Sequence, residues 1–470
     1  MDYRSFLARK SQLINENGFE PIWMPDRVGK YRVKDFQHYL IDWAIRAGRA
    51  SIFADCGLGK TLMMLIFAEN VVRKTNKPFL IVTPLAVANQ TVREGEKFGI
   101  EVTYSRDGKH KGGIVVTNYE RLHYFDSAQF AGAAGDEISA IKAFDGKRRK
   151  QVTRFFSKFD YRLTASATPA PNDYIELGTV SEALGVMTQS DMLGYFFRET
   201  ENRRHTVFTD EKYQVKWTFK PHSEQPFWRW VASWARAIQK PGDLGFSNKG
   251  YILPPLNMVS HTIDVPWIPP GELFPRPAIS LAEQREERHR SINERCEKVC
   301  ELLDHDRPSI AWCHYNEEGD LLEKMIPDCV QIAGRHSLDE KEEKLIAFSN
   351  GQIKRMVTKP KIGCWGLNWQ HCGDMTFFPS HSFEQFYQAM RRCWRFGRKG
   401  PVNVGVISSE GESRVIAGLD HKQEQAMHMF ASVVQHMKDA MAMNSKDGHI
   451  NPIIIPQWIE EPSCQLSTSA

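Results

Sequence analysis

The chain has 470 residues, which is more than one ordinary α/β core needs and enough for two. Its formal charge is only +4, from 61 basic and 57 acidic residues, so overall charge does not by itself attract a polyanion. No apolar run is long enough to cross a bilayer, and the charged start MDYRSFLARKSQ lacks a signal-peptide core. We therefore expect a soluble cytoplasmic protein with no membrane partner.

Residues 1–179 alternate short apolar runs with amphipathic stretches. The strand-like runs include FLIVTP from Phe79, IVVTN from Ile114 and YRLTAS from Tyr161. This alternation is typical of a parallel sheet covered by helices. It predicts an N-terminal α/β lobe over residues 1–179.

The alternation stops between residues 180 and 279. This segment holds clustered aromatic residues, Trp217, Phe219, Phe227, Trp228, Trp230 and Trp234, and then many prolines. We predict an insertion followed by a linker. The aromatic residues fit a small satellite core on the first lobe better than a platform on which nucleic-acid bases stack.

The alternation returns in residues 280–445, which predicts a second α/β lobe, and residues 446–470 read as a tail. The fold class is thus α/β, with two parallel-sheet lobes in tandem. A helical segment from Ser413 carries several methionines, which we expect to fill a core. His314 follows the strand-like run IAWC and could face a nucleic acid, but a histidine at a strand end with its hydrogen bonds satisfied fits better.

The nine cysteines are odd in number and contain no Cys-x-x-Cys pair, which argues against a disulfide framework. Cys296 and Cys300 would lie one turn apart on a helix, with His289 nearby, so a metal site there is conceivable. A buried thiol pair in a reducing compartment fits better. We predict no metal held by cysteine.

The segment ADCGLGKT, residues 54–61, has the pattern of a phosphate-binding loop between a strand and an apolar helix. Gly57 and Gly59 would allow the tight turn that points backbone N–H groups at phosphates. Lys60 would contact the phosphates, and the Thr61 hydroxyl would bind Mg²⁺. The sequence therefore predicts an ATP site that uses magnesium.

ATP hydrolysis also needs one carboxylate near the magnesium and another that orients or deprotonates water. Asp136 and Glu137 are the candidates for these two roles, although the preceding FAGAAG is a weak strand. Asp145, in a turn-like FDG, is an alternative without a neighbouring glutamate.

The segment QAMRRCWRFGR places Gln388, Arg392 and Arg395 at helical spacing, with Arg398 close behind. Such guanidinium groups could reach across to a nucleotide on the other lobe and stabilise transition-state charge. The alternative is a solvated basic face, but the apolar residues among these arginines argue against it.

The motifs DCGLGKT, TP at Thr83-Pro84, TNYERL, DEIS, SATP, GLNWQ and QAMRRCWRFGR occur in the order seen in superfamily 2 helicase-type motors. Over residues 30–410 the chain resembles the Swi/Snf-like branch of that superfamily. The resemblance implies two RecA-like lobes that close on ATP and step along a nucleic-acid strand.

The resemblance also implies residue roles. Gln37 matches the glutamine that reads adenine, Gln388 belongs with the nucleotide-binding residues, and Arg392 and Arg395 match the finger positions. Ser166 and Thr168 resemble the relay between hydrolysis and lobe movement. The positions that touch nucleic acid are Thr83, Pro84, Thr117, Asn118, Thr358 and Asn368.

We therefore predict an ATP-dependent nucleic-acid motor, either a DNA helicase or a double-stranded DNA translocase. DNA is the expected partner, the protein is expected to be a monomer, and its place is the cytoplasm of a prokaryotic or virus-infected cell. A nucleic-acid-binding clamp with weak ATPase activity is the alternative. A P-loop enzyme that acts on a small molecule would have no use for the arginine-rich motif.

Overall fold

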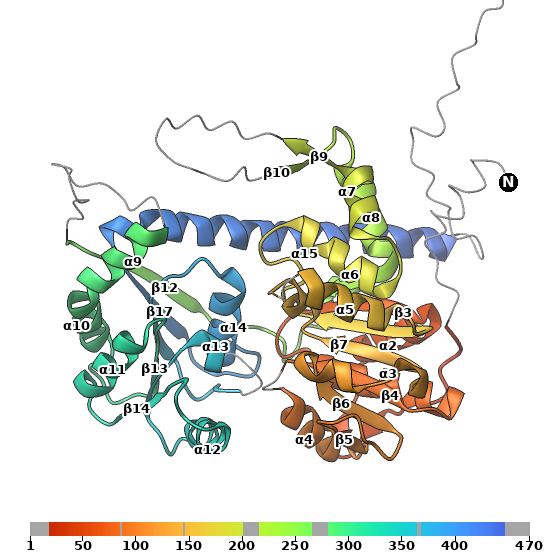
Figure 1. Ribbon diagram of the computed structural model, residues 1–470, viewed down its shortest axis with the longest axis horizontal. Helices are drawn as coiled ribbons and strands as arrows, with labels where there is room; N and C mark the ends of the chain where they lie inside the picture. Colours follow the sequence, from red (N-terminus) through yellow and green to blue (C-terminus); the bar gives the residue numbers. More distant parts are fainter. Residues whose placement is uncertain are drawn as a thin grey trace, which may run out of the picture.

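The computed structural model describes residues 18–84, 87–143, 146–200, 216–265, 281–363 and 368–446. Every element named below belongs to these residues. Two α/β lobes lie side by side, and one long helix crosses from the second to the first (Figure 1).

The first lobe is built on a seven-stranded parallel sheet with the order β11-β3-β8-β7-β4-β6-β5. Its strands are β3 (Arg49–Ala54), β4 (Phe79–Thr83), β5 (Val102–Tyr104), β6 (Ile114–Asn118), β7 (Gly132–Asp136), β8 (Tyr161–Ser166) and β11 (Ala235–Ile238). Its helices are α2 (Asp35–Ala47), α3 (Lys60–Thr75), α4 (Ala88–Phe98), α5 (Gly146–Phe156), α6 (Leu177–Leu184), α7 (Gln189–Phe196) and α8 (Glu224–Trp234). Two short antiparallel pairs are β1 (Arg27–Val28) with β2 (Tyr31–Arg32), and β9 (Phe197–Thr200) with β10 (Lys216–Phe219).

The second lobe has a six-stranded parallel sheet with the order β12-β17-β16-β13-β15-β14. Its strands are β12 (Leu256–Ile263), β13 (Ser309–Trp312), β14 (Cys329–Ile332), β15 (Arg355–Thr358), β16 (Asp374–Phe377) and β17 (Val402–Ser409). Its helices are α9 (Leu281–Arg290), α10 (Ile292–Leu302), α11 (Asn316–Met325), α12 (Leu338–Ser349), α13 (Pro360–Gly363) and α14 (Phe383–Cys393). The short 3-10 helices of the two lobes are η1 (Tyr119–Tyr124), η2 (Ser127–Gln129), η3 (Ile138–Ala143), η4 (Tyr174–Glu176), η5 (Pro241–Leu244) and η6 (Glu410–Glu412).

These two parallel sheets with flanking helices fit two RecA-like lobes in tandem, so the fold class predicted from the sequence is confirmed. His314 is partly buried, and its Nε2 lies 2.9 Å from the carbonyl oxygen of Phe378. Desolvation lowers the pKa of His314 to about 4. It is the hydrogen-bonded histidine at a strand end that we expected.

The predicted weak strand before Asp136 is the regular, fully buried strand β7. Its small residues are required by close neighbours. A Cβ on Gly132 would lie 2.8 Å from the ring of Phe79, and one on Gly135 would lie 2.8 Å from Ile138. Tertiary packing therefore overrides the low strand propensity of this segment.

The segment 180–279 is not a separate insertion, and this corrects the predicted boundaries. Strand β11 pairs with β3 at one edge of the first sheet, and β12 pairs with β17 at one edge of the second. Neither strand shows a long apolar run in the sequence: β11 is the short segment ARAI, which Arg236 interrupts, and most of β12 is exposed. Residues 266–280 lie outside the described residues.

The aromatic residues of this segment form a core, as expected. Helix α8 buries Phe227, Trp228, Trp230 and Trp234, which pack with β11 and with residues of the first sheet. They complete the first lobe, so a base-stacking platform is not supported by their burial.

Helix α15 (Ser413–Lys446) follows the second sheet and continues onto the first lobe (Figure 1). Near its start, Lys422 Nζ donates to the carbonyl oxygen of His381 in the second lobe. Further along, Phe430 and Val433 join the hydrophobic cluster that contains Trp228. The predicted second lobe, residues 280–445, therefore ends too late, because its last helix belongs to both lobes. Residues 447–470, nearly all of the predicted tail, lie outside the described residues.

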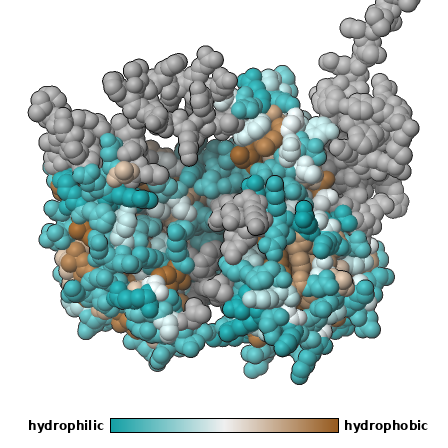
Figure 2. Space-filling model, viewed as in Figure 1, coloured by the Kyte–Doolittle hydropathy of each residue, from teal (hydrophilic) through white to brown (hydrophobic). Residues whose placement is uncertain are grey.

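In the view of Figure 2 the surface is mostly hydrophilic, and hydrophobic residues form small scattered groups. Among the described residues, no helix combines the length and the apolar character needed to span a membrane.

Candidate nucleotide site at the lobe interface

The phosphate-loop motif forms a turn between β3, which ends at Ala54, and α3, which begins at Lys60. Gly57 and Gly59 have φ angles of +91° and +86°, in the left-handed region that favours glycine. A Cβ on Gly59 would lie only 2.4 Å from Gln37 Nε2. The loop thus leads tightly into the N-terminus of α3, where N–H groups and the helix dipole favour an anion.

Two side chains hold this loop in place. Lys60 Nζ donates to the carbonyl oxygen of Ala54 at 2.9 Å and lies 3.9 Å from Glu137 Oε1. Gln37 Nε2 donates to the carbonyl oxygen of Leu58 at 2.9 Å, and its Oε1 accepts from the backbone N–H of Lys34. Gln37 therefore supports the phosphate loop directly, and its role toward adenine stays a prediction. Thr61 is partly buried in the first turn of α3.

Asp136 and Glu137 lie at the carboxyl end of β7, on the same sheet edge as the phosphate loop. Burial, and then the charge of Glu137, raise the pKa of Asp136 to about 7, while Lys60 opposes this shift. A divalent cation would favour the ionised form of such a buried carboxyl group, so the residues present fit Mg²⁺. Glu137 has a φ of +45°, which is unusual outside glycine. The alternative candidate Asp145 lies outside the described residues.

A chain of hydrogen bonds leads from Glu137 to the second lobe. Ser166 Oγ donates to Glu137 Oε2 at 2.9 Å and accepts from the N–H of Thr168 at 3.0 Å. It lies 3.3 Å from the Oγ of Ser139, which donates to Glu384 Oε1 at 2.9 Å. Glu384 is in the first turn of α14. The structure thus connects the predicted coupling residue Ser166 to the other lobe through Ser139, the last residue of the DEIS motif, to which the sequence analysis gave no role.

The arginine-rich motif brings the second lobe against the phosphate loop. The Nε and Nη2 atoms of Arg395 lie 3.7 and 3.8 Å from the position of a Cβ on Gly57. Burial, and then the nearby charge of Arg392, lower the pKa of Arg395. An arginine side chain stays cationic and presents several N–H donors, so a guanidinium group in this position is suited to receive an anionic phosphate.

For the other predicted residues of this motif, the structure gives contacts within the second lobe or burial rather than a distance to the phosphate loop. Gln388 is buried, and among the described residues its Nε2 has no hydrogen-bond partner. Arg392 is partly buried, and its carbonyl oxygen accepts from the N–H of Trp369. Arg398 turns back to its own lobe, where its guanidinium donates to the carbonyl oxygens of Gln370 and Gly400.

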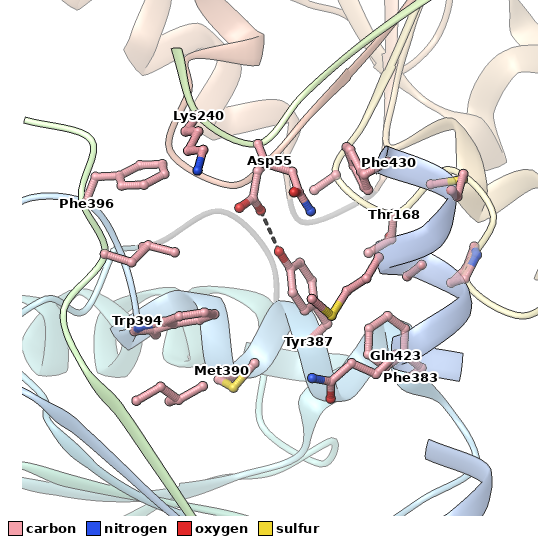
Figure 3. Close-up of a pocket in the computed structure, with 18 of the residues that line it drawn as sticks. Asp55, Thr168, Lys240, Phe383, Tyr387, Met390, Trp394, Phe396, Gln423 and Phe430 are labelled. Carbon is pink, nitrogen blue, oxygen red and sulfur yellow. Dashed lines mark hydrogen bonds between the residues drawn. The ribbon is translucent and has the colours of Figure 1, made fainter. Parts of the chain in front are cut away.

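A second contact between the lobes uses Asp55, Tyr387 and Arg391, to which the sequence analysis gave no role. Arg391 Nη2 donates to Asp55 Oδ2 at 2.7 Å and to the carbonyl oxygen of Cys56 at 3.0 Å. The Tyr387 hydroxyl donates to Asp55 Oδ1 at 2.7 Å (Figure 3). Burial, and then the charge of Asp55, raise the pKa of Tyr387, so this hydroxyl stays a donor. Tyr387 and Arg391 are four residues apart in the sequence, and this spacing on one helix face was the available signal.

A cavity of about 510 Å³ lies beside this contact, between the two lobes (Figure 3). Residues of the first lobe, of the second lobe and of α15 line the cavity, among them Asp55, Thr168, Tyr251, Met390, Trp394 and Phe430. The lining is mostly apolar. The lobes are therefore in contact at Asp55 and leave a cavity between them next to the phosphate loop.

Most of the residues predicted to touch nucleic acid are buried in the structure, and their role toward nucleic acid stays a prediction. Thr83, Thr117 and Asn118 lie at the ends of β4 and β6 with essentially no exposed surface. The Thr117 hydroxyl donates to the carbonyl oxygen of Ser105, and Asn118 Oδ1 accepts from the hydroxyl of Tyr104. In the structure these hydrogen bonds tie the end of β6 to the neighbouring chain.

The remaining predicted contacts divide in the same way. Pro84 is buried, and so is Thr358, whose hydroxyl donates to the carbonyl oxygen of Ile332. Asn368 is exposed on the second lobe. Lys361, just after β15, is exposed on the same lobe. Residues 364–367 lie outside the described residues, and they include the first two residues of the GLNWQ motif.

Comparisons with known proteins add two similarities. No protein-family model matches the chain. Protein p41 of Acyrthosiphon pisum secondary endosymbiont phage 1 is 26% identical over 170 residues, which are 31% of this chain and 37% of that protein. The chain thus matches little more than a third of the length of this relative.

Among solved structures, the chain is similar to the Sulfolobus solfataricus SWI2/SNF2 ATPase core in complex with dsDNA. The TM-score is 0.41 and the sequence identity 15%, over 90% of this chain and 98% of that one. The assignment of two RecA-like lobes rests on the strand order and direction of the two sheets described above.

Proposed function

We propose that the chain is an ATP-dependent nucleic-acid motor whose ATP site is shared by its two lobes. The observation that supports this most is the position of Arg395, a residue of the second lobe, within 4 Å of the Cβ position of Gly57 in the phosphate loop of the first. A site completed by both lobes makes ATP hydrolysis depend on their relative position, which is what a motor requires.

Each site residue has a role in this proposal. The loop around Gly57 and Gly59 binds the phosphates, and Lys60 pairs with them. Thr61 and Asp136 would hold Mg²⁺, which when bound neutralises charge on the phosphate oxygens. Glu137 orients the attacking water and accepts its proton, since its carboxylate is fixed by the hydroxyl of Ser166.

Arg392 and Arg395 stabilise the charge that develops on the transferred phosphoryl group. An arginine supplied in this way accelerates hydrolysis by roughly 10³- to 10⁵-fold in P-loop enzymes. When the lobes separate, the guanidinium groups leave the phosphates and hydrolysis stops.

DNA is the proposed partner, gripped through its phosphates without reading sequence. Support comes from the order of the motifs and from exposed polar and basic groups on the second lobe, such as Asn368 and Lys361. The alternative is a clamp with weak ATPase activity. A poorly formed strand before Asp136 would favour it, because the carboxylates of Asp136 and Glu137 would then be badly positioned for hydrolysis. Because β7 is a regular, buried strand, the motor is the better supported of the two.

The test is Arg395→Ala, with the exposed neighbour Lys399→Ala as a matched control. We expect Arg395→Ala to lower kcat by about 10³-fold or more while ATP binding changes little. Lys399→Ala should leave both unchanged. ATP turnover is measured with single-stranded DNA, double-stranded DNA and RNA, together with strand displacement. Normal DNA-stimulated turnover in Arg395→Ala would show that the site is not shared by the lobes.

We also propose that the protein acts as a monomer in the cytoplasm of a bacterial or phage-infected cell. The partial similarity to a phage protein is consistent with that place. Light scattering on the purified protein measures the oligomeric state, and a stable dimer would contradict the first part of this proposal.

A further inference from the structure

A buried ion pair joins the two lobes at the start of the phosphate loop. The side chain of Arg391, on α14, has no exposed surface, and that of Asp55, just after β3, is 7% exposed. The guanidinium group of Arg391 also lies over the ring of Trp394, 4.9 Å from its centre. Removing either charge would leave the other buried without its partner, so this contact depends strongly on both residues.

The position of Asp55 gives the pair a consequence for phosphate binding. The carbonyl oxygen of the preceding residue, Ala54, holds Lys60 Nζ, and Asp55 Oδ1 accepts from the N–H of Cys56 inside the loop. The carboxylate is therefore fixed next to the place where an anion would bind. A carboxylate without a cationic partner there would oppose a triphosphate, because like charges repel strongly where water is excluded.

Resting on the proposed function, we propose that Arg391 is a positioning residue that neutralises Asp55 only when the lobes are together. Closing of the lobes then does two things at once: it brings Arg395 to Gly57, and it removes a negative charge beside the phosphate site. By linkage, if closure strengthens ATP binding, ATP binding favours closure to the same extent. The nucleotide and the second lobe thus bind the first lobe cooperatively.

Tyr387 specifies the closed arrangement together with Arg391. The two residues donate to different oxygens of Asp55, so α14 holds both oxygens of the carboxylate. The contact is not saturated, however. Among the described residues, Nε and Nη1 of Arg391 have no hydrogen-bond partner. Unsatisfied buried donors weaken the closed state, which keeps the contact reversible.

The test is a double-mutant cycle with Arg391→Met, Asp55→Asn and the double variant Asp55→Asn/Arg391→Met. Binding of the fluorescent N-methylanthraniloyl ATP with Mg²⁺ is titrated separately from the rate of hydrolysis. We expect Arg391→Met to weaken binding by about 10-fold, within the usual range of coupling between sites. The double variant should recover most of that loss, because no carboxylate remains to repel the phosphates. Its kcat should stay low, because the contact that positions α14 is absent.

A purely structural role for the pair predicts that Arg391→Met and Asp55→Asn weaken nucleotide binding alike, since each leaves one buried charge without its partner. The inference predicts that Arg391→Met weakens binding and that Asp55→Asn does not, since only the first leaves a carboxylate beside the phosphates. Equal losses in the two single variants would show that the inference is wrong. Binding by Arg391→Met that equals wild type would also overturn it. If wild-type protein binds no nucleotide, the proposed function itself fails, so the two failures are distinguishable.

Tyr387→Phe covers the case in which Arg391→Met does not fold. This variant removes one hydroxyl and keeps the ring, so it should fold, and we expect a loss of binding of about 10-fold, near the lower end of what one hydrogen bond to a charged group contributes. The same loss should vanish when Tyr387→Phe is made in the Asp55→Asn background. An equal loss in both backgrounds would contradict the inference.

Discussion

Gly59 is the residue at which the phosphate loop tolerates the least change. Its φ of +86° strains any other residue, and a Cβ there would lie 2.4 Å from Gln37 Nε2. Gly99 offers a matched control, because it has a φ of +68° at the end of α4 and no atom within 4 Å of a Cβ. The two glycines share the strained φ and differ in crowding.

We predict that Gly59→Ala abolishes nucleotide binding, since Gln37 must leave the carbonyl oxygen of Leu58. Gly99→Ala should cost about 1 kcal/mol of folding free energy and leave nucleotide binding intact. Thermal unfolding and nucleotide titration of both variants check this. Equal nucleotide affinity in Gly59→Ala and wild type would show that the loop does not need its crowded path.

Asp136 makes a prediction about pH in protein without metal. Its pKa is raised from an ordinary value of 3.8 to about 7, so the folded state disfavours its ionised form. Its unfavourable contribution is therefore absent below pH 4, grows between pH 4 and 7, and is complete above pH 7. The free energy of unfolding falls over that window by up to a few kcal/mol because of this group.

Asp136→Asn should remove this dependence, because the amide does not titrate. With a chelator present, the melting temperature of Asp136→Asn should exceed that of wild type by a margin that widens from pH 4 to pH 7. Differential scanning calorimetry at several pH values measures the margin. A margin that is constant over the window would mean that the pKa of Asp136 is ordinary.

Among single residues, the sequence was most informative where chemistry requires a fixed local pattern. Gly57, Gly59 and Lys60 form the predicted loop because residues close together in the sequence are enough to specify it. The contact between Asp55 and Arg391 joins residues 336 positions apart. Nothing local marks such a pair, because the fold alone brings the two charges together.

At the scale of elements, α15 shows what a helix can do that its own sequence does not reveal. Its methionines were expected to fill a core, and the side chains of Met429 and Met437 are buried, although Met427 is 60% exposed. The core in question belongs to the first lobe, which the helix reaches after leaving the second. Hydrophobic spacing predicts a buried helix face without naming the surface that buries it.

We predict that Met429→Ala and Met437→Ala each destabilise the protein by about 2–5 kcal/mol, the usual cost of truncating a buried side chain. Met427→Ala, on the same helix, is the control and should change stability by less than about 0.5 kcal/mol. Chemical denaturation followed by circular dichroism measures these differences. A Met437→Ala variant as stable as the control would mean that the end of α15 does not pack on the first lobe.

Strands were predicted well where a buried apolar run marked them and poorly elsewhere. β4, β6 and β8 have such runs, whereas β11 is short and β12 is largely exposed. Edge strands need fewer buried residues, so their sequences resemble loops. For this reason the sequence of segment 180–279 predicts an insertion, whereas its strands β11 and β12 in fact complete the two sheets.

The whole molecule is held together by lobe contacts of two kinds. Ser139 with Glu384 and Asp55 with Arg391 are largely buried. Arg93 on α4 and Glu342 on α12 form an exposed ion pair. Salt screens exposed charges over a distance of about 10 Å at 0.1 M and has much less effect on buried ones.

We predict that the lobes stay together in nucleotide-free protein when the salt concentration is raised from about 0.05 to about 0.5 M, a range that screens exposed pairs. The radius of gyration from small-angle X-ray scattering should be unchanged over this range. Arg93→Ala should likewise have no effect on it. An increase of the radius with salt would show that exposed pairs, rather than the buried ones, hold the lobes.

Helix α15 finally limits the kinds of motion that the molecule can make. A helix of 34 residues is about 51 Å long at 1.5 Å per residue, and this one is anchored at each end to a different lobe. Moving the lobes straight apart would break the contacts of α15 with one lobe and expose the apolar side chains at that contact. Swivelling about the axis of the helix would keep both anchors. For the motor proposed above, the lobe movement that preserves both anchors is therefore a rotation about the axis of α15, and its amplitude is limited by how far one anchor can turn before its apolar side chains lose their contacts.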